Sequence, residues 1–301
     1  GNTREIAETA ANKILENNPY NTRWDKVFYR DFVPVTRTDV SLSGGTDNTS
    51  YYLSLGYFKQ ESTTNPSADY RRYTLNGSIN TQITKWLKTG LSFSAGHNER
   101  DGGNTDTTAR INTLPFYTPT LEDGSRKDFI GNIVNPTLGF YHPVYYSDKH
   151  PRASVGDDFM PSGFISIEPF KNLIFKTQGG VQYSYGDSES KELASFMNYK
   201  LRTPMLTTNP YTSFSSSRSL RKTITNTLEY RFLLGKDLKN SFNVLLGQES
   251  ISNSSKSLTL RTIGQPSDGL STLSHGNKSR TVDDDKGTTT FNSYFGRLEY
   301  S

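Results

Sequence analysis

Apolar and polar residues alternate along much of this chain, and this period of two limits the folds that it can adopt. Residues 50–60 show the pattern most clearly, because Tyr51, Leu53, Leu55 and Tyr57 all fall on one face. Successive side chains of a β-strand point to opposite faces, so the pattern predicts a strand with one apolar face. The chain is therefore expected to be all-β from residue 35 onward.

The links between the predicted strands fall into two length classes. Strands are predicted at about 35–45, 50–60, 70–82, 87–98, 162–168, 173–185, 221–232, 241–249 and 290–301. Every second link is short, and the other links are longer, with the last three forming loops at about 99–157, 186–220 and 250–289. Consecutive antiparallel strands place alternate links at opposite ends of a sheet, so short turns and long loops separate. Outer-membrane barrels have this layout, with short periplasmic turns and long extracellular loops.

The composition supports a membrane barrel rather than a soluble domain. Only 32% of the residues are hydrophobic and the mean hydropathy is -0.68, yet the chain has 18 Tyr and 17 Phe. A soluble domain usually has about 45–50% apolar residues, and disordered chains contain few aromatic residues. A barrel needs apolar side chains only toward the lipid, between girdles of aromatic residues. We predict a lipid-facing band that contains Tyr51, Leu53, Leu55, Tyr57, Tyr73, Leu75, Leu91 and Phe93.

The first 34 residues differ from the rest of the chain. Residues 4–17 place Ile6, Ala7, Ala10, Ala11 and Ile14 on one helical face, which predicts a short helix. A loop is expected to follow through residues 18–24. The predicted organisation is a helix and loop at 1–34, placed outside the cell, and a partial transmembrane β-barrel at 35–301.

Nothing in the sequence indicates an enzyme or a metal site. We find no nucleotide-binding loop and no nucleophile elbow, and the four histidines lack metal-binding spacing. The acidic segments 101–106 and 283–285 are interpreted as solvated loops, since the first lacks the spacing of a calcium loop. A net charge of +4 without a clustered basic face does not indicate nucleic acid. We predict no catalytic residues, no metal, no cofactor and no nucleic-acid partner.

The long loops hold the candidate binding residues. These are Phe116, Tyr117, Tyr141, Tyr145 and Tyr146. Sugar rings stack on aromatic side chains, and binding residues are often carried by loops. In the alternative interpretation, which we favour, these aromatic side chains pack the loops together or contact a partner protein.

Four segments of the chain resemble a known family. They are residues 19–28 (PYNTRWDKVF), 40–57 (VSLSGGTDNTSYYLSLGY), 243–249 (NVLLGQE) and 293–300 (SYFGRLEY). In these segments the chain resembles the SusC/RagA-type TonB-dependent transporters of Bacteroides-like bacteria. The second segment is the most specific because it is long and has no gap. Arg23 departs from the family pattern, in which Asp is expected.

The resemblance implies a bacterial outer-membrane importer of oligosaccharides or peptides. It implies a closed barrel of about 22 strands around an N-terminal plug, of which this chain is an open piece of about nine strands without the plug. It also implies a SusD-like surface lipoprotein as a lid, and the TonB complex as an energy source acting through the plug region. Two other functions stay open, a passive porin and a surface glycan-binding β-protein.

The residues also bear on these alternatives and on the stability of the piece. A glycan-binding β-protein would need a dry core, so large apolar side chains should interrupt the polar strand faces. Phe164, Leu245 and Phe295 are such interruptions, but they are few. Nine strands of a larger barrel leave two unpaired edges, so we expect an open, curved sheet that is unstable as an isolated monomer.

Overall fold

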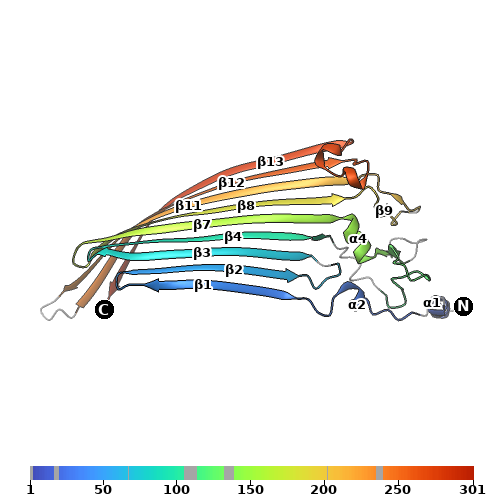
Figure 1. The fold of residues 1–301 in the computed structure, drawn as a ribbon, viewed down its shortest axis with the longest axis horizontal. Coiled ribbons are helices and arrows are strands. Elements are labelled where there is room, and N and C mark those ends of the chain that lie inside the picture. Colours follow the sequence, from blue (N-terminus) through green and yellow to red (C-terminus); the bar gives the residue numbers. More distant parts are fainter. Residues whose placement is uncertain are drawn as a thin grey trace.

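One large antiparallel sheet dominates the protein (Figure 1). The structure is a computed structural model, and it describes residues 3–16, 20–66, 68–104, 114–131, 139–201, 203–234 and 240–301. Within these ranges the sheet has nine strands, which neighbour one another in chain order. They are β1 (Val35–Gly45), β2 (Thr49–Glu61), β3 (Asp69–Thr84), β4 (Leu87–Gly103), β7 (Pro151–Phe170), β8 (Leu173–Glu192), β11 (Tyr211–Leu234), β12 (Asn240–Ile263) and β13 (Ser279–Tyr300).

The smaller elements all lie before or between these strands. The helices are α1 (Thr3–Glu16), α2 (Trp24–Phe28), α4 (Pro143–Lys149), η2 (Asp268–Leu270) and η3 (Leu273–His275). Two small antiparallel pairs join β5 (Phe129–Ile130) to β6 (Phe140–Tyr141), and β9 (Met197–Asn198) to β10 (Met205–Leu206). The helix predicted at residues 4–17 is confirmed as α1, whereas α2 was not predicted. No helix in the described part of the chain is both long and apolar enough to cross a membrane.

The two classes of link lie at opposite ends of the sheet, as predicted. Short links join β1 to β2, β3 to β4 and β7 to β8 at one end, which we call the turn end. The links from β2 to β3, β4 to β7, β8 to β11 and β12 to β13, together with α2 and α4, lie at the opposite end, which we call the loop end (Figure 1). β1 and β13 are the two edges and do not pair with each other. The predicted fold class, an open antiparallel sheet of about nine strands, is confirmed.

The predicted extents of the three long loops are wrong. The connections cover 104–150, 193–210 and 264–278, because β4, β7, β8, β11, β12 and β13 continue well past the predicted strand ends. The added segments are rich in polar residues on both faces, for example Ser213, Ser215, Ser216 and Ser217 in β11. Alternation is lost there, but the ladder of backbone hydrogen bonds continues. Residues 283–285, interpreted as a loop, therefore lie within β13, and 105–106 lie outside the described residues.

The register of the strands brings the predicted band together on one face. Leu55 pairs with Val40 on β1 and with Leu75 on β3, and Tyr57 pairs with Tyr73. Tyr51, Ile79 and Leu91 form a second row across β2, β3 and β4. None of the eight predicted band residues is buried, and Leu55 is 57% exposed. We call this side of the sheet the apolar face; within the described residues, it lacks a covering layer of protein.

Aromatic rings lie over glycines of neighbouring strands. Phe93 pairs with Gly77 on the apolar face, where a Cβ on Gly77 would lie 2.5 Å from a carbon of the Phe93 ring. On the polar face, Phe164 and Phe295 lie in the same way against Gly90 and Gly247. These contacts give the large apolar interruptions of the polar face a local role, so they do not require a dry core.

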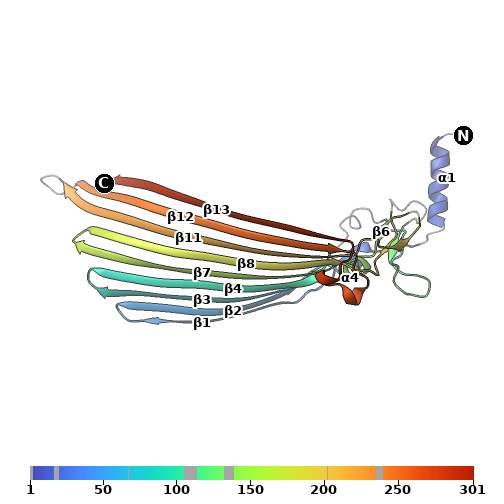
Figure 2. The same ribbon diagram turned by 90° about the horizontal axis from the view of Figure 1, so that it is seen from above.

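The buried apolar residues lie at the loop end rather than in the sheet. Among the described residues, they are Trp24, Phe28, Phe129, Ile130, Phe140, Tyr141, Tyr145 and Phe196. All of them belong to α2, α4 or the connections 104–150 and 193–210. Helix α1 projects away from this region and its side chains are exposed where they are described (Figure 2). The described residues therefore form a sheet that none of them covers, with a packed cap at one end.

Candidate functional site

The first part of the cap is a cluster that fastens α2 to the long connection between β4 and β7. Trp24, Phe28, Ile130 and Phe140 form this tryptophan cluster. The Trp24 and Phe140 rings meet edge to face with centroids 5.4 Å apart. The Trp24 indole N–H donates to the carbonyl of Leu114 at 2.9 Å, so its polar atom is also satisfied. Trp24, the first residue of the five-residue helix α2, therefore attaches this helix to the connection between β4 and β7.

The second part is a cluster that joins two different connections. Phe129, Tyr141 and Tyr145 come from the connection 104–150, and Phe196 comes from 193–210. Tyr141 and Phe196 have ring centroids 5.1 Å apart, and Tyr141 and Phe129 have centroids 5.5 Å apart. We call these four residues the tyrosine cluster. Rings at these separations pack as edge-to-face or tilted pairs, which stabilise a protein interior beyond the area they bury.

The tyrosine hydroxyls hold the second connection by hydrogen bonds. The Tyr145 hydroxyl accepts from the backbone N–H of Met197 at 2.7 Å, and the Tyr141 hydroxyl accepts from that of Tyr199 at 3.2 Å. The Tyr141 hydroxyl also donates to the side-chain oxygen of Asn198 at 3.1 Å. Burial raises the pKa of Tyr141 and the pKa of Tyr145 to about 12, so both stay protonated at neutral pH.

Two buried histidines frame α4. His142 precedes the helix, and its ring accepts a hydrogen bond from the backbone N–H of Val144 at 3.2 Å. Burial lowers the pKa of His142 to about 4, so the ring is neutral and suited to this acceptor role. His150 follows the helix, stacks on Tyr146 with centroids 4.0 Å apart, and lies 3.3 Å from a carboxylate oxygen of Glu192. The histidines thus fix α4 between the sheet and the two connections.

The five predicted binding residues occupy different environments. Tyr141 and Tyr145 are each 3% exposed and belong to the tyrosine cluster. Tyr146 is half-buried against that cluster. Tyr117 packs against the tryptophan cluster, and the ring of Phe116 lies 4.7 Å from that of Tyr117. Of the two interpretations, sugar stacking and packing within the protein, the geometry of Tyr141 and Tyr145 favours packing.

A cavity of about 390 Å³ lies beside both clusters at the loop end. The hairpin arms around residues 117–121 and 126–131 form most of its lining, and Tyr199 closes it from the other connection. The lining combines the aromatic rings of Tyr117, Phe129 and Tyr199 with the charged side chains of Arg126, Lys127 and Asp128. Its volume falls within the range of small-ligand sites. Sequence reasoning identified Tyr117 but missed the other residues, because no local pattern links 126–131 to Tyr199.

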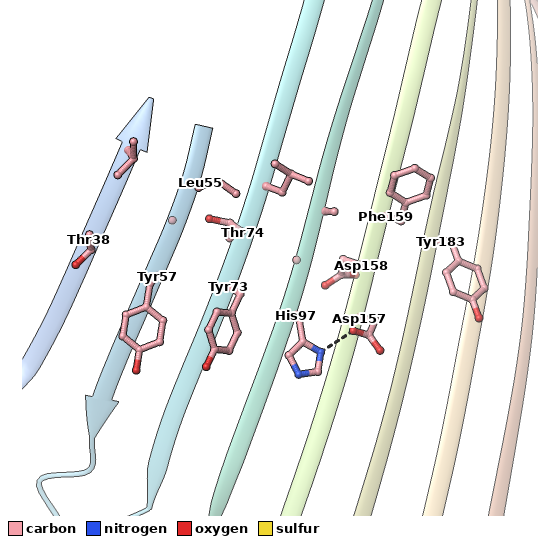
Figure 3. A pocket seen from close by; sticks show the side chains of 15 residues that line it. Thr38, Leu55, Tyr57, Tyr73, Thr74, His97, Asp157, Asp158, Phe159 and Tyr183 are labelled. Carbon is pink, nitrogen blue, oxygen red and sulfur yellow. Dashed lines mark hydrogen bonds and ion pairs between the residues drawn. The ribbon is translucent and has the colours of Figure 1, made fainter. Parts of the chain in front are cut away.

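A second hollow of about 630 Å³ lies on the apolar face (Figure 3). Leu55, Tyr57, Tyr73 and Phe159 contribute to its lining, and Ala95 leaves space between larger neighbours. His97 stands in the same ladder row as Tyr57 and Tyr73, and its ring nitrogen lies 2.7 Å from a carboxylate oxygen of Asp157. The hollow is an open depression in the band rather than an enclosed site. His97 is a polar interruption of the apolar face that alternation alone did not reveal.

The described residues show no arrangement suited to a metal ion. No group of three or more His, Asp or Glu side chains converges among them.

Comparison with known proteins identifies relatives of the chain. TonB-dependent receptor P26 of Formosa agariphila is 24% identical over 277 residues, which cover 89% of this chain and 26% of that protein. TonB-dependent receptor P3 of the same organism is 34% identical over 87 residues, or 29% of this chain and 8% of that protein. The chain is homologous to TonB-dependent receptors. No protein-family model matches it.

Solved structures also match the sheet of this chain. A structure of the RagAB peptide transporter matches with a TM-score of 0.79 and 27% identity, covering 93% of this chain and 31% of that chain. The RagAB peptide importer in its open-open state matches with a TM-score of 0.78 and 26% identity, covering 94% and 32%. The predicted resemblance to receptors of the RagA type is confirmed. The chain spans about a quarter of the length of receptor P26 and a third of the RagAB chains it matches.

Proposed function

We propose that these residues are part of the barrel wall and the outer loops of a TonB-dependent importer in the bacterial outer membrane. The observation that carries the proposal is the match over 93% of the chain to the RagAB peptide transporter, at 27% identity and a TM-score of 0.79. The uncovered apolar face supports it, because a sheet in lipid can leave that face without a protein layer. The band from Tyr51 to Phe93 would then contact outer-membrane lipid.

The loop end would face the outside of the cell and receive the substrate. Long loops on that side carry binding residues in outer-membrane barrels, and here two connections pack into a defined cap. Residues 1–34 would belong to the same outer surface. We propose an oligosaccharide or a peptide as the transported ligand, with Phe116, Tyr117 and Tyr146 as the predicted binding residues that are only partly buried.

Two partners follow from the same proposal. A SusD-like surface lipoprotein would cover the loop end, and the exposed helix α1 projects from that side (Figure 2). The TonB complex would supply energy through a plug that occupies the barrel lumen and lies outside these residues. The polar face of the sheet suits such a lumen, because serine, threonine, asparagine and lysine side chains line it.

Growth of a gene-deletion strain tests the proposed function. The deletion is expected to abolish growth on one oligosaccharide or peptide mixture as sole carbon source, and the restored gene should recover it. Loss of TonB function should produce the same defect. Unchanged growth on every such substrate would contradict the importer, and uptake that persists without TonB would favour the passive porin.

A further inference from the structure

The cavity of about 390 Å³ at the loop end is lined by two basic residues, Arg126 and Lys127, and only Arg126 pairs with an acid among the described residues. Arg126 is engaged by two acids, since its Nη1 lies 3.2 Å from a carboxylate oxygen of Asp148 and its Nε lies 3.8 Å from one of Asp128. Lys127, which also lines the cavity, forms no ion pair with any described residue. Its backbone N–H donates to Pro119 at 2.9 Å, so the main chain at this position is fixed.

The aromatic lining next to this cation offers flat apolar surface. Tyr199 stacks on Phe129 with an interplanar angle of 15° and centroids 5.5 Å apart, which holds both rings in place. Tyr117 lies at the other arm of the hairpin and packs against the tryptophan cluster. The rings are therefore set by the cap before any ligand arrives, which lowers the entropic cost of binding.

The remaining charges select the sign of the ligand. Burial raises the pKa of Asp128, and its carboxylate faces Arg126 rather than Lys127 as its ion-pair partner. A cationic ligand would compete with Arg126 for Asp128 and would meet Lys127 as a like charge. An anionic ligand would pair with Lys127 without breaking the existing pairs. Charge-assisted hydrogen bonds of this kind are the strong ones in a partly dry site.

We propose that this cavity binds the carboxylate-bearing end of the imported ligand, with Lys127 pairing the carboxylate and the rings of Tyr117 and Tyr199 contacting the adjoining flat part. The inference rests on the proposed import function and names the chemistry of its substrate. A peptide C-terminus and a uronic acid of an oligosaccharide both present a carboxylate beside an apolar surface. The cavity volume suits one or two such units rather than a long chain.

Calorimetric binding to the full-length protein in detergent tests the inference with two matched pairs of probes. The peptide pair is trialanine and trialanine amide, and the saccharide pair is trigalacturonic acid and its fully methyl-esterified form. At least one acid is expected to bind, and its neutral counterpart should bind about tenfold more weakly or not at all. The pair that shows the difference identifies the source of the carboxylate.

Two variants separate the cavity from general electrostatics. Lys127→Gln is expected to weaken binding of the acid about tenfold and to leave any binding of the neutral probe unchanged. Lys171→Gln, in the turn between β7 and β8 at the far end of the sheet, removes the same charge and should change neither. Equal binding of acid and neutral probes, equal effects of the two variants, or binding of neither acid would overturn the inference. The growth phenotype of the deletion strain is independent of these results, so the proposed import function can hold even when the carboxylate site is refuted.

Discussion

Truncation of Phe140 offers a test of how the cap is held to the sheet. Phe140 lies in β6, is 0% exposed, and packs against Trp24 of α2. Phe140→Ala removes the ring from the centre of the tryptophan cluster and leaves a cavity beside Trp24 and Ile130. The helix α2 has only five residues and cannot persist without this packing.

The size of the effect follows from complete burial of the ring. Replacing a buried Phe by Ala typically costs about 3–5 kcal/mol, as the sum of lost transfer free energy and the residual cavity. Backbone hydrogen bonds from Thr22 to Pro115 and from Asn65 to Phe28 remain and hold the flanks of the segment. We expect the lower end of this range, about 3 kcal/mol, which corresponds to local opening about 100 times more frequent.

Hydrogen exchange of the full-length protein in detergent measures this opening. Amides of α2 and of residues 139–141 are expected to exchange about 100 times faster in Phe140→Ala. Amides within β2 should keep their protection, because the ladder with β1 and β3 does not involve the cap. Local opening of this kind is a feature of elements with little buried contact area.

A matched control is available on the same connection to the sheet. Phe32 follows α2 and is 80% exposed, so Phe32→Ala removes an equal ring without touching the cluster and should leave exchange unchanged. If Phe140→Ala leaves α2 protected while β2 remains folded, the tryptophan cluster is not what docks the helix. If β2 loses protection as well, the cap and the sheet unfold as one unit and their separation is refuted.

Three further predictions address the cap and the sheet. The pKa of His142 is lowered to about 4, so its ring stays neutral in the closed cap, whereas the opened chain takes up a proton as the pH falls below about 6.5. The stability of the cap is therefore full above about pH 6.5 and declines toward pH 4, by up to about 3 kcal/mol. Thermal unfolding of His142→Asn should lose this pH dependence. Gly77→Ala should lower the stability of the sheet by about 1–3 kcal/mol, because the new methyl would overlap the Phe93 ring. In thermal melts, the double variant with Phe93→Ala should lose less stability than the sum of the two single variants. Equality with that sum would refute the contact. Tyr141→Phe removes the acceptor for a backbone N–H of the connection 193–210 and should cost about 1–3 kcal/mol; faster proteolysis within that connection is the expected result, and an unchanged cleavage rate would contradict it.

The sheet could be predicted because its signals are local. Alternation in 50–60 placed Leu55 and Tyr57 on one face, and the register with Leu75 and Tyr73 agrees with that placement. The short links then indicated which strands pair, since a tight turn joins two antiparallel strands that lie side by side. Strand ends were missed where serine occupies both faces, because a polar ladder outside the apolar band has no alternation to detect.

The cap was decided by tertiary structure alone. Whether Tyr141 stacks on a sugar or packs inside the protein depends on Phe196, which lies in a different connection. Likewise, Arg126 and Lys127 are adjacent basic residues in the sequence, and only the folded structure shows that Asp148, 22 residues from Arg126, pairs with Arg126 while Lys127 forms no ion pair with any described residue. The alternation of apolar and polar residues can be recognised from consecutive residues, whereas burial and charge pairing depend on which distant segments come into contact. The sequence therefore determined the wall of this protein, and the tertiary structure determined its candidate binding site.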